Sequence, residues 1–485
     1  MHIIKQLKTV YLQTLTIHIN TIMTLITSIS GIRGTLGGKT GESLTPVDIT
    51  KFTCAYGSWL KSKFPQERLK VIVGRDARIS GPVVNKMVTA TLQFMGIDII
   101  DAGLVPTPTV EIGVREYGCN GGIIITASHN PRNWNALKLL NEKGEFLNQE
   151  EAKQMMSFAN AQITGFVTAD KLGTYTKEEA AIEMHIEKVL ALELVDTDAI
   201  AAANFHVVVD AVNSVGGIAV PMLLDALGVK KVTELFCEPN GLFPHNPEPL
   251  PEHLSILSEE VQKVNAHVGF ALDPDADRLA IVRNDGEMFG EEYTLVAVAD
   301  YVLQHQKGNT VSNLSSTQAL KVVTEKHGGK YYASAVGEVN VVQKMKEVNA
   351  VIGGEGNGGV IYPPIHYGRD ALTGIALFLT HLAKSKKNVV ALKKELPDYH
   401  ISKHKIELSD GIDLGNILNK MASRYNNQRI DKTDGVKIYF DKDWVHLRKS
   451  NTEPIIRIYA ESDSDAKSET LARKIMVDIS ELIKE

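Results

Sequence analysis

The chain has 485 residues, of which 44% are hydrophobic and 23% are charged, and its formal net charge is −6. This composition is typical of a globular protein with a large core, and the length corresponds to about three domains, with two or four also allowed. Because the chain carries no block of basic residues and no apolar run of roughly 18 residues, neither nucleic acid nor a membrane is an expected partner.

Residues 1–22 do not follow the pattern of the rest of the chain. Lys5, Lys8, Gln13 and His18 interrupt the apolar residues there, so no secretory signal peptide is predicted. The regular pattern begins near Met23, and we interpret residues 1–22 as an upstream misreading or a loose tail. The cysteines match no zinc or redox spacing, which favours a reducing, cytoplasmic location.

A succession of strand, loop, helix, glycine and strand recurs three times along the chain. This succession is the signature of βαβ units in a largely parallel sheet, and a glycine suits the left-handed position at a helix end. Three copies predict three related α/β domains. Their first strands are expected at residues 69–73, 205–209 and 310–314, and their helices end before Gly96, Gly228 and Gly328.

Two segments near the N-terminus carry arginines. Arg33 follows Ser30 and Gly31, and we expect it to line the functional site. Arg75 and Arg78 flank Asp76 and offer further cations, although a structural ion pair between Arg75 and Asp76 is an equally good interpretation.

The segment Thr-Ala-Ser-His-Asn-Pro at 126–131 directly follows the apolar run 122–125. A serine at the mouth of a strand is suited to carry a phosphoryl group, and Ser128 is the candidate. The alternative is an ordinary turn, since Asn130 and Pro131 are turn residues.

The segment Asp-Pro-Asp-Ala-Asp-Arg at 273–278 also follows an expected buried strand, at 267–272. Three carboxylates at alternating positions repel one another unless a cation lies among them, so a divalent metal site is predicted. An EF-hand loop is excluded because Arg278 and Asn284 replace the required Gly and Glu. A solvated charge run remains the alternative. In parallel sheets ligands gather at the carboxyl ends of strands, which is where Ser128 and Asp273 fall.

A glycine-rich loop at 353–359 presents Glu355 and Asn357, whose oxygens and amide suit vicinal sugar hydroxyls. The alternative is a plain flexible loop. Beyond about residue 398 the pattern changes to short strands at 405–408, 436–440, 444–447 and 455–460, followed by a helix at 465–484. A fourth domain of α+β type with an antiparallel sheet is therefore predicted.

A basic segment at 448–457 lies between two strands of this last domain. Its arginines and hydroxyl-bearing side chains suit a phosphate monoester, whereas the alternative is a hairpin with solvated arginines. The residues concerned are Arg448, Ser450, Asn451, Thr452 and Arg457.

From about residue 24 onward, these four motifs in this order resemble the α-D-phosphohexomutase family. The resemblance implies three related mixed-sheet α/β domains and a C-terminal α+β domain around a central cleft. We expect the domains at 24–175, 176–286, 287–397 and 398–485. It also implies a phosphohexomutase that acts on a small-molecule sugar phosphate, as a monomer or homodimer, with a hexose 1,6-bisphosphate as intermediate and activator.

Site roles follow from the same resemblance, residue by residue. Ser128 matches the phosphoserine, and its phosphate would bind Mg²⁺ together with three aspartates. His129 and Lys138 match residues assigned to positioning or proton transfer, and Arg278 matches the arginine that closes the metal loop. The metal ligands are Asp273, Asp275 and Asp277, the sugar contacts Glu355 and Asn357, and the phosphate clamp Arg448, Ser450, Asn451, Thr452 and Arg457.

The sugar loop departs from the common family pattern. Many relatives have histidine where this chain has Gly359, and the form Gly-Glu-Gly-Asn-Gly-Gly resembles the archaeal-type phosphoglucosamine mutases. The expected reaction interconverts glucosamine 6-phosphate and glucosamine 1-phosphate, with mannose or glucose phosphates as the alternative substrates. His366 is interpreted either as a replacement for the missing histidine or as an ordinary surface residue.

Two other classes of protein fit part of the pattern. A metal-dependent phosphatase would use the same serine and carboxylates but would not need Glu355 or Arg448. A non-catalytic sugar-phosphate-binding protein would keep Glu355 and Arg448 but would not need Ser128 beside three carboxylates. The presence of all four motifs argues against both.

Overall fold

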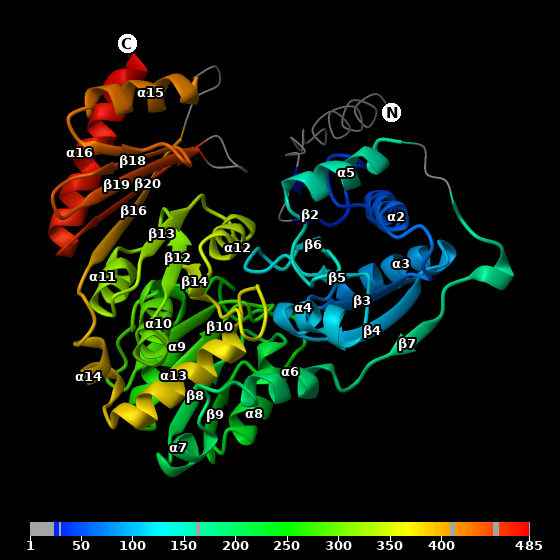
Figure 1. Ribbon diagram of the computed structural model, residues 1–485, viewed down its shortest axis with the longest axis horizontal. Coiled ribbons are helices and arrows are strands. Elements are labelled where there is room, and N and C mark those ends of the chain that lie inside the picture. The colour runs from blue at the N-terminus through cyan, green and yellow to red at the C-terminus, as the bar shows by residue number, and fades with distance from the viewer. Residues whose placement is uncertain (1–23, 29–30, 162–164, 408–412, 450–454, 485) are drawn as a thin grey trace, which may run out of the picture.

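The computed structural model describes residues 24–28, 31–161, 165–407, 413–449 and 455–484. The expectations for residues 1–22 and for Ser450, Asn451 and Thr452 lie outside these described residues. The described chain forms four separate sheets. The N-terminal sheet lies at the right of Figure 1, two further sheets lie in the middle, and the C-terminal sheet lies at the upper left.

The first sheet has seven strands in the order β1-β2-β6-β5-β3-β4-β7. β3, β4, β5 and β7 run parallel, whereas β6 pairs antiparallel with both β5 and β2. The strands are β1 (Ile26–Ser28), β2 (Gly31–Thr35), β3 (Lys70–Arg75), β4 (Asp98–Leu104), β5 (Gly121–Ile125), β6 (Trp134–Leu140) and β7 (Tyr175–Lys177). The accompanying helices are α2 (Pro46–Lys63), α3 (Gly81–Phe94), α4 (Thr107–Glu116), α5 (Gln149–Ala159) and the 3₁₀ turn η1 (Ala169–Lys171).

Both faces of the central strands β3 and β5 are buried, which explains their continuous apolar runs, whereas the edge strand β7 is exposed. Successive side chains point to opposite faces of a strand. Val71 and Val73 therefore pack with α2 and α3, while Ile72 packs with α4 in a different core. Likewise Ile124 faces the α4 side, between neighbours that face the other way.

The second and third sheets share one plan of four strands, in the orders β11-β10-β8-β9 and β13-β12-β14-β15. In each sheet three strands are parallel and the fourth is antiparallel at one edge. The strands are β8 (His206–Asp210), β9 (Lys231–Leu235), β10 (Val268–Leu272), β11 (Leu279–Arg283), β12 (Asn309–Asn313), β13 (Tyr331–Ser334), β14 (Ala350–Glu355) and β15 (Gly359–Ile361).

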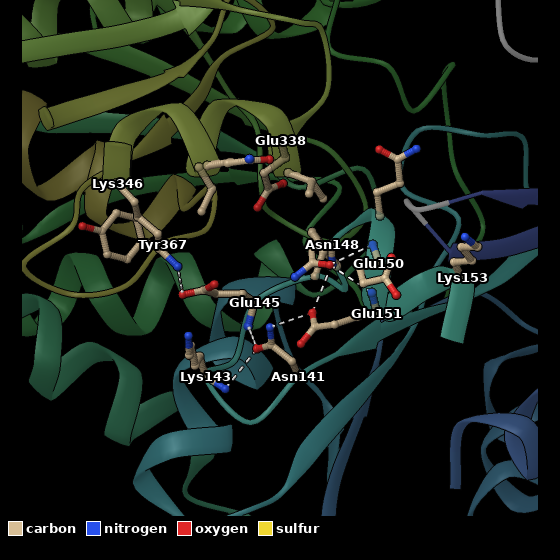
Figure 2. Close-up of a pocket in the computed structure, with 15 residues that line it drawn as sticks. Asn141, Lys143, Glu145, Asn148, Glu150, Glu151, Lys153, Glu338, Lys346 and Tyr367 are labelled. Atoms are coloured by element: carbon tan, nitrogen blue, oxygen red, sulfur yellow. Dashed lines mark hydrogen bonds and ion pairs between the residues drawn. The ribbon is translucent and has the colours of Figure 1, made fainter. Parts of the chain in front are cut away.

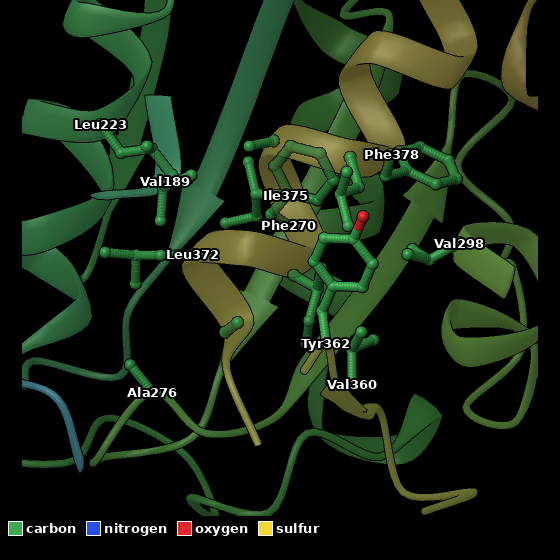
Figure 3. Packing of buried hydrophobic residues seen from close by; sticks show 14 of the residues in the cluster. Val189, Leu223, Phe270, Ala276, Val298, Val360, Tyr362, Leu372, Ile375 and Phe378 are labelled. Carbon is green, nitrogen blue, oxygen red and sulfur yellow. The ribbon is translucent and has the colours of Figure 1, made fainter. Parts of the chain in front are cut away.

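Most helices of these two sheets share a core that continues between them, whereas α9 (Ser255–Lys263) and α12 (Glu338–Glu347) pack in smaller cores of their own. The helices are α6 (Ala181–Leu190), α7 (Thr197–Ala202), α8 (Gly216–Ala226), η2 (Pro251–His253), α9 (Ser255–Lys263), α10 (Tyr293–His305), α11 (Ala319–Lys326), α12 (Glu338–Glu347), α13 (Ala371–Ser385) and α14 (Val389–Lys393). Figure 3 shows Leu372, Ile375 and Phe378 of α13 inside this core. Phe378 meets Phe270 of β10 edge to face, so α13 ties the second sheet to the third.

The fourth sheet is antiparallel throughout, in the order β16-β20-β19-β18-β17. Its strands are β16 (His400–Glu407), β17 (Arg429–Asp431), β18 (Val436–Tyr439), β19 (Trp444–Lys449) and β20 (Ile455–Ser462), and its helices are α15 (Leu414–Arg424) and α16 (Asp465–Lys484). The predicted fold class and the closing helix are confirmed. β17 was not predicted, and β16 begins before the expected strand. No described helix is long and apolar enough to cross a membrane.

Candidate functional site

The three central motifs occupy the same place in three sheets. In each sheet a parallel strand leads into the motif, and an antiparallel strand returns from it: β5 to β6, β10 to β11 and β14 to β15. Ser128, the 273–278 segment and the 356–358 turn are therefore equivalent hairpin connections at the carboxyl ends of parallel strands, where such sheets collect ligands.

Ser128 has an unusual backbone conformation. Its φ is 47°, a left-handed value that is costly for a residue other than glycine. The Ser128 hydroxyl donates to Asp273 Oδ2 at 2.6 Å, and His129 Nδ1 lies 3.2 Å from the same hydroxyl oxygen. The turn thus directs the serine oxygen into the acidic cluster of the second sheet.

The side chain of Arg78 holds the backbone of the serine loop through hydrogen bonds. Its guanidinium donates to the carbonyl oxygens of Ser128 at 2.5 Å and Asn130 at 2.6 Å, and also to those of Pro131 and Trp134. Arg78 is completely buried, and its Nε pairs with Asp76 at 3.0 Å. Asp76 therefore pairs with Arg78, whereas Arg75 donates only to the backbone oxygen of Asp76. Arg78, which the sequence offers as a further cation around the serine, therefore holds the backbone of the serine loop.

The three aspartates of the second sheet form a single buried group. One oxygen from each of Asp273, Asp275 and Asp277 lies within 4.8 Å of the others. Burial, together with the charges of its two neighbours, raises the pKa of Asp273 well above its usual range. The solvated-charge alternative is wrong because all three side chains are buried.

This acidic group fits a hard divalent cation. Asp275 Oδ1 and Asp277 Oδ1 are buried and have no hydrogen-bond partner. Carboxylate oxygens are the ligands that Mg²⁺ prefers, and a cation would relieve the repulsion that raises the pKa of Asp273. The residues therefore suit a magnesium site that includes the serine oxygen.

Lys138 and Thr107 hold the same loop from the first domain. Lys138 Nζ lies 2.6 Å from Asp275 Oδ2 and 3.6 Å from Asp277 Oδ2, and Thr107 Oγ1 donates to Asp275 Oδ2 at 2.7 Å. Burial alone would raise the pKa of Asp275, but the Lys138 ammonium outweighs it and holds this pKa below its usual range. Asp275 therefore stays ionised, and Thr107 directs the N-terminus of α4 at it.

Arg369 joins the metal loop to the sugar loop, a role that the sequence analysis missed. Its Nη2 lies 2.6 Å from Asp277 Oδ2, its Nη1 lies 3.1 Å from Glu355 Oε2, and its Nε lies 2.9 Å from Glu338 Oε2. One guanidinium thus binds carboxylates that lie far apart in the chain. The local signal was the charged pair Arg369-Asp370 directly before α13.

Glu355 ends β14, and its carboxylate is almost fully buried. Asn357 lies in the following turn, where its Oδ1 accepts the amide of Gly359 at 3.3 Å. A Cβ on Gly359 would lie 2.3 Å from Arg369 Cδ. A larger side chain such as histidine would therefore displace Arg369, so this position favours glycine.

The other expected site residues divide into two groups. Arg33 lies half-buried on β2. Burial, followed by the charges of Arg278, Arg369 and Arg33, holds the pKa of His129 well below its usual range. Arg278 follows the acidic group and lies 3.5 Å from Glu248. His129 therefore lies beside Ser128 and Arg278 beside the acidic group, whereas Arg448 and Arg457 belong to the fourth sheet.

Arg448 on β19 stands directly opposite Arg457 on β20. Side chains that are directly opposite on neighbouring strands share a face, and like charges there repel. Lys405 of β16 continues the row next to Arg457. A row of cations on one face is suited to a phosphate group. The remaining clamp residues, Ser450, Asn451 and Thr452, lie outside the described part of the chain.

His366 is not a surface residue, so that interpretation is wrong. It is only 4% exposed, and its Nδ1 lies 3.1 Å from Glu111 Oε2 of α4. Its Nε2 faces Asp370 at 3.5 Å. The imidazole is therefore held between the helix α4 of the first domain and the segment before α13 of the third.

A cavity of about 570 Å³ borders the site on the side of Glu338. Figure 2 shows it between the segment that leads into α5 and the helix α12, with Lys346 reaching Glu145 across it. Because Glu338 also holds Arg369, this cavity adjoins the site from between the first and third domains.

Profiles of four protein domains match the chain in order. They are described as phosphoglucomutase/phosphomannomutase alpha/beta/alpha domains I, II and III, at residues 25–164, 183–286 and 290–399, and the C-terminal domain of the same enzymes, at residues 405–477. Together they cover most of the chain.

Individual proteins match over nearly their whole length. A phosphoglucomutase/phosphomannomutase of Thermococcus kodakarensis is 36% identical over 441 residues, which cover 90% of this chain and 95% of that protein. A phosphoglucosamine/phosphogalactosamine mutase of Sulfurisphaera tokodaii is 30% identical over 460 residues, which cover 93% of this chain and 98% of that protein. The crystal structure of a phosphoglucomutase/phosphomannomutase family protein from Burkholderia thailandensis superimposes with a TM-score of 0.79 at 25% identity. The superposition covers 96% of this chain and 98% of that protein. The chain therefore belongs to the α-D-phosphohexomutase family and is a phosphohexomutase.

Proposed function

We propose that the protein interconverts glucosamine 6-phosphate and glucosamine 1-phosphate through a phosphoserine at Ser128 and a bisphosphorylated sugar. The observation that carries the proposal is the 2.6 Å contact between Ser128 Oγ and Asp273 within a buried acidic group. Arg369 connects this group to Glu355, so phosphoryl transfer and hydroxyl recognition share one framework.

Ser128 carries the phosphoryl group and passes it to a sugar hydroxyl. Asp273, Asp275 and Asp277 would hold Mg²⁺, which supplies positive charge to the transferring phosphoryl group. Lys138 and Arg278 add fixed positive charge beside that group, and such preorganised charge stabilises the transition state. The neutral imidazole of His129 orients the serine oxygen.

The sugar loop binds the sugar, and the phosphate clamp binds the phosphate that is remote from Ser128. Glu355 and Asn357 accept and donate to hydroxyls, and Arg33 lines the same site. Arg448 and Arg457, with Ser450, Asn451 and Thr452, bind the phosphate that is not reacting. The bisphosphate turns over between the two transfers, so each orientation uses the same sugar and phosphate contacts. The domains 24–175, 176–286, 287–397 and 398–485 each contribute one loop.

Glucose or mannose phosphate is the second candidate substrate. It is favoured by the Thermococcus kodakarensis phosphoglucomutase/phosphomannomutase, which is 36% identical to this chain. Glucosamine is favoured by the sequence of the sugar loop and by the Sulfurisphaera tokodaii enzyme.

A kinetic comparison separates the two candidates. Purified protein with Mg²⁺ and the matching hexose 1,6-bisphosphate is assayed with the 1-phosphates of glucosamine, glucose and mannose. The highest kcat/KM is expected for glucosamine, and a higher value for glucose or mannose would reverse the assignment. Inorganic phosphate is measured in parallel, because release as fast as isomer formation would indicate a phosphatase.

A further inference from the structure

The strand β19 presents a polar face to the third domain. Alternation along the strand directs Val445 and Leu447 into the core beneath α15 and α16. Trp444, His446 and Arg448 consequently share the opposite face. His446 is the next residue on this face before Arg448, so its contacts bear directly on where the clamp arginine lies.

His446 is buried and bridges two domains. Its Nε2 lies 2.6 Å from the carbonyl oxygen of Asp434, and its Nδ1 lies 2.9 Å from Ser315 Oγ, in the loop after β12. Burial lowers the pKa of His446 to about 4, so the ring is neutral at physiological pH. A carbonyl only accepts, so Nε2 carries the proton and Nδ1 accepts the Ser315 hydroxyl.

The loop after β12 links the contact between Ser315 and His446 to the sugar loop through hydrogen bonds. Asn313 Oδ1 accepts the amide of Ser315 at 2.9 Å, and Asn313 Nδ2 donates to Glu355 Oε1 at 3.0 Å. Ser316 Oγ accepts the amide of Gly356 at 3.0 Å. The loop therefore holds both the carboxylate and the backbone of the sugar-binding turn.

A second series of contacts, through Asp434, also connects Arg448 with Glu355. Asp434 Oδ2 lies 3.6 Å from Arg448 Nε and accepts the amide of Val336 at 3.0 Å. The next amide, of Gly337, donates to Glu355 Oε1 at 3.2 Å. Both series of contacts end on one oxygen of Glu355, while Arg369 holds the other oxygen.

We propose that Ser315, His446 and Asp434 are positioning residues that set the separation between the Arg448 phosphate clamp and Glu355. The inference rests on the proposed function, which assigns the sugar to Glu355 and the remote phosphate to Arg448. A sugar that binds in two orientations requires the same separation twice, because its hydroxyls and its remote phosphate must meet both groups each time. A bridge of buried hydrogen bonds supplies that constancy.

The test compares contacts across one interface. Ser315→Ala and His446→Ala each remove the bridge, whereas Gln318→Ala removes a hydrogen bond to the Lys442 carbonyl that does not lead to Glu355. Each bridge variant should raise KM for the sugar phosphate roughly ten-fold, the scale of one buried hydrogen bond. Gln318→Ala and Ser315→Thr, which keeps the hydroxyl, should stay near wild type.

Two further measurements distinguish positioning from general stability. Phosphate on Ser128, measured by intact mass, should be unchanged in the bridge variants, because they leave the serine loop intact. Ser315→Ala should add little to the loss caused by Arg448→Ala, since the bridge acts through that arginine. Equal KM values for Ser315→Ala and Gln318→Ala, an impaired Ser315→Thr, or additive losses with Arg448→Ala would overturn the bridge. A wild-type protein that forms no isomer would instead remove the proposed function itself.

Discussion

Ser128 combines a left-handed backbone with a reactive side chain. The conformation is held by the four carbonyl contacts of Arg78 and by the amide of Ser128, which donates to Thr126 Oγ1 at 2.9 Å. Strain that the surroundings hold in place is characteristic of functional turns. Here it directs the hydroxyl toward Asp273 instead of toward the surface.

This geometry predicts that activity and stability separate in Ser128→Gly. Glycine adopts a φ of 47° without strain, so the variant should be at least as stable as wild type. It should lose at least about three orders of magnitude in kcat, because the nucleophile is gone. Unfolding by urea and intact-mass analysis check both parts. Ser157→Ala, on the exposed face of α5, is the control, and phosphate on the Ser128→Gly protein would contradict the assignment.

The side chain of Arg369 restricts which residue type fits at position 359. A Cβ there would lie 2.3 Å from Arg369 Cδ and 2.9 Å from Cγ, and the head of that arginine is fixed by three carboxylates. The side chain cannot move aside without breaking ion pairs to the metal and sugar loops. Glycine and Arg369 are therefore a matched pair.

We expect Gly359→His to lower kcat/KM by roughly ten-fold or more, the scale of a lost charge-assisted fork. It should also lower Tm, since the ion pairs of Arg369 are buried. Gly415→Ala, at the exposed start of α15, should leave both unchanged or raise Tm slightly. An active and stable Gly359→His protein would show that Arg369 has room to move.

Among the elements, the connection from β10 to β11 is held both by the first domain, through Thr107, and by its own domain, through Ser214. Thr107 at the start of α4 donates to Asp275, and Ser214 at the start of α8 donates to the Pro274 carbonyl at 2.5 Å. Ser214 Oγ also accepts the amide of Ala77. The metal loop and the serine loop are thereby registered against one another.

Removing a carboxylate from this loop should weaken metal binding and catalysis together. For Asp275→Ala we expect a clear loss of Mg²⁺ affinity in titration calorimetry and a loss of about two orders of magnitude in kcat, the scale of a missing electrostatic contact. Asp285→Ala, in the exposed turn after β11, serves as the control. Full activity of wild type in excess chelator would refute the metal role.

At the scale of the molecule, a buried cluster ties three domains together behind the site. His366 pairs with Glu111 of α4 and faces Asp370, which also lies 3.1 Å from His185 of α6. Burial alone would lower the pKa of His366, but Asp370 and Glu111 outweigh it and raise that pKa to about 9. The protonated imidazole is therefore part of the folded structure.

This shift predicts a stability that falls at alkaline pH. The pKa in the folded state lies above the ordinary value of 6.5, so the contribution is fully present below pH 6.5 and is lost as pH rises through about 9. The stability advantage of wild type over His366→Gln should shrink by on the order of 3 kcal/mol across that window. Unfolding at several pH values measures it, with His400→Gln of the fourth sheet as control. A difference that does not change with pH would mean that His366 is neutral when folded.

The reactive groups could be predicted from the amino-acid sequence, because each lies within a few residues of a strand whose apolar run is visible locally. Ser128 and the three aspartates follow such strands, and the closing helix at 465–484 carries its own periodicity. The repeated strand-loop-helix succession was visible for the same reason, and so was the family resemblance, which rests on short contiguous motifs.

The contacts that hold these groups could not be predicted from the sequence, because they join residues that are far apart in the chain. Arg78 fastens a loop some fifty positions further along, Arg369 joins loops that lie on two different sheets, and His366 is enclosed by helices of other domains. Contacts of this kind leave no periodic mark in the sequence, since a buried arginine or histidine reads the same as an exposed one until its partners are placed. These contacts are set by the free-energy cost of burying a charge without a partner. That cost is avoided only when the whole chain has folded and each buried charge is paired.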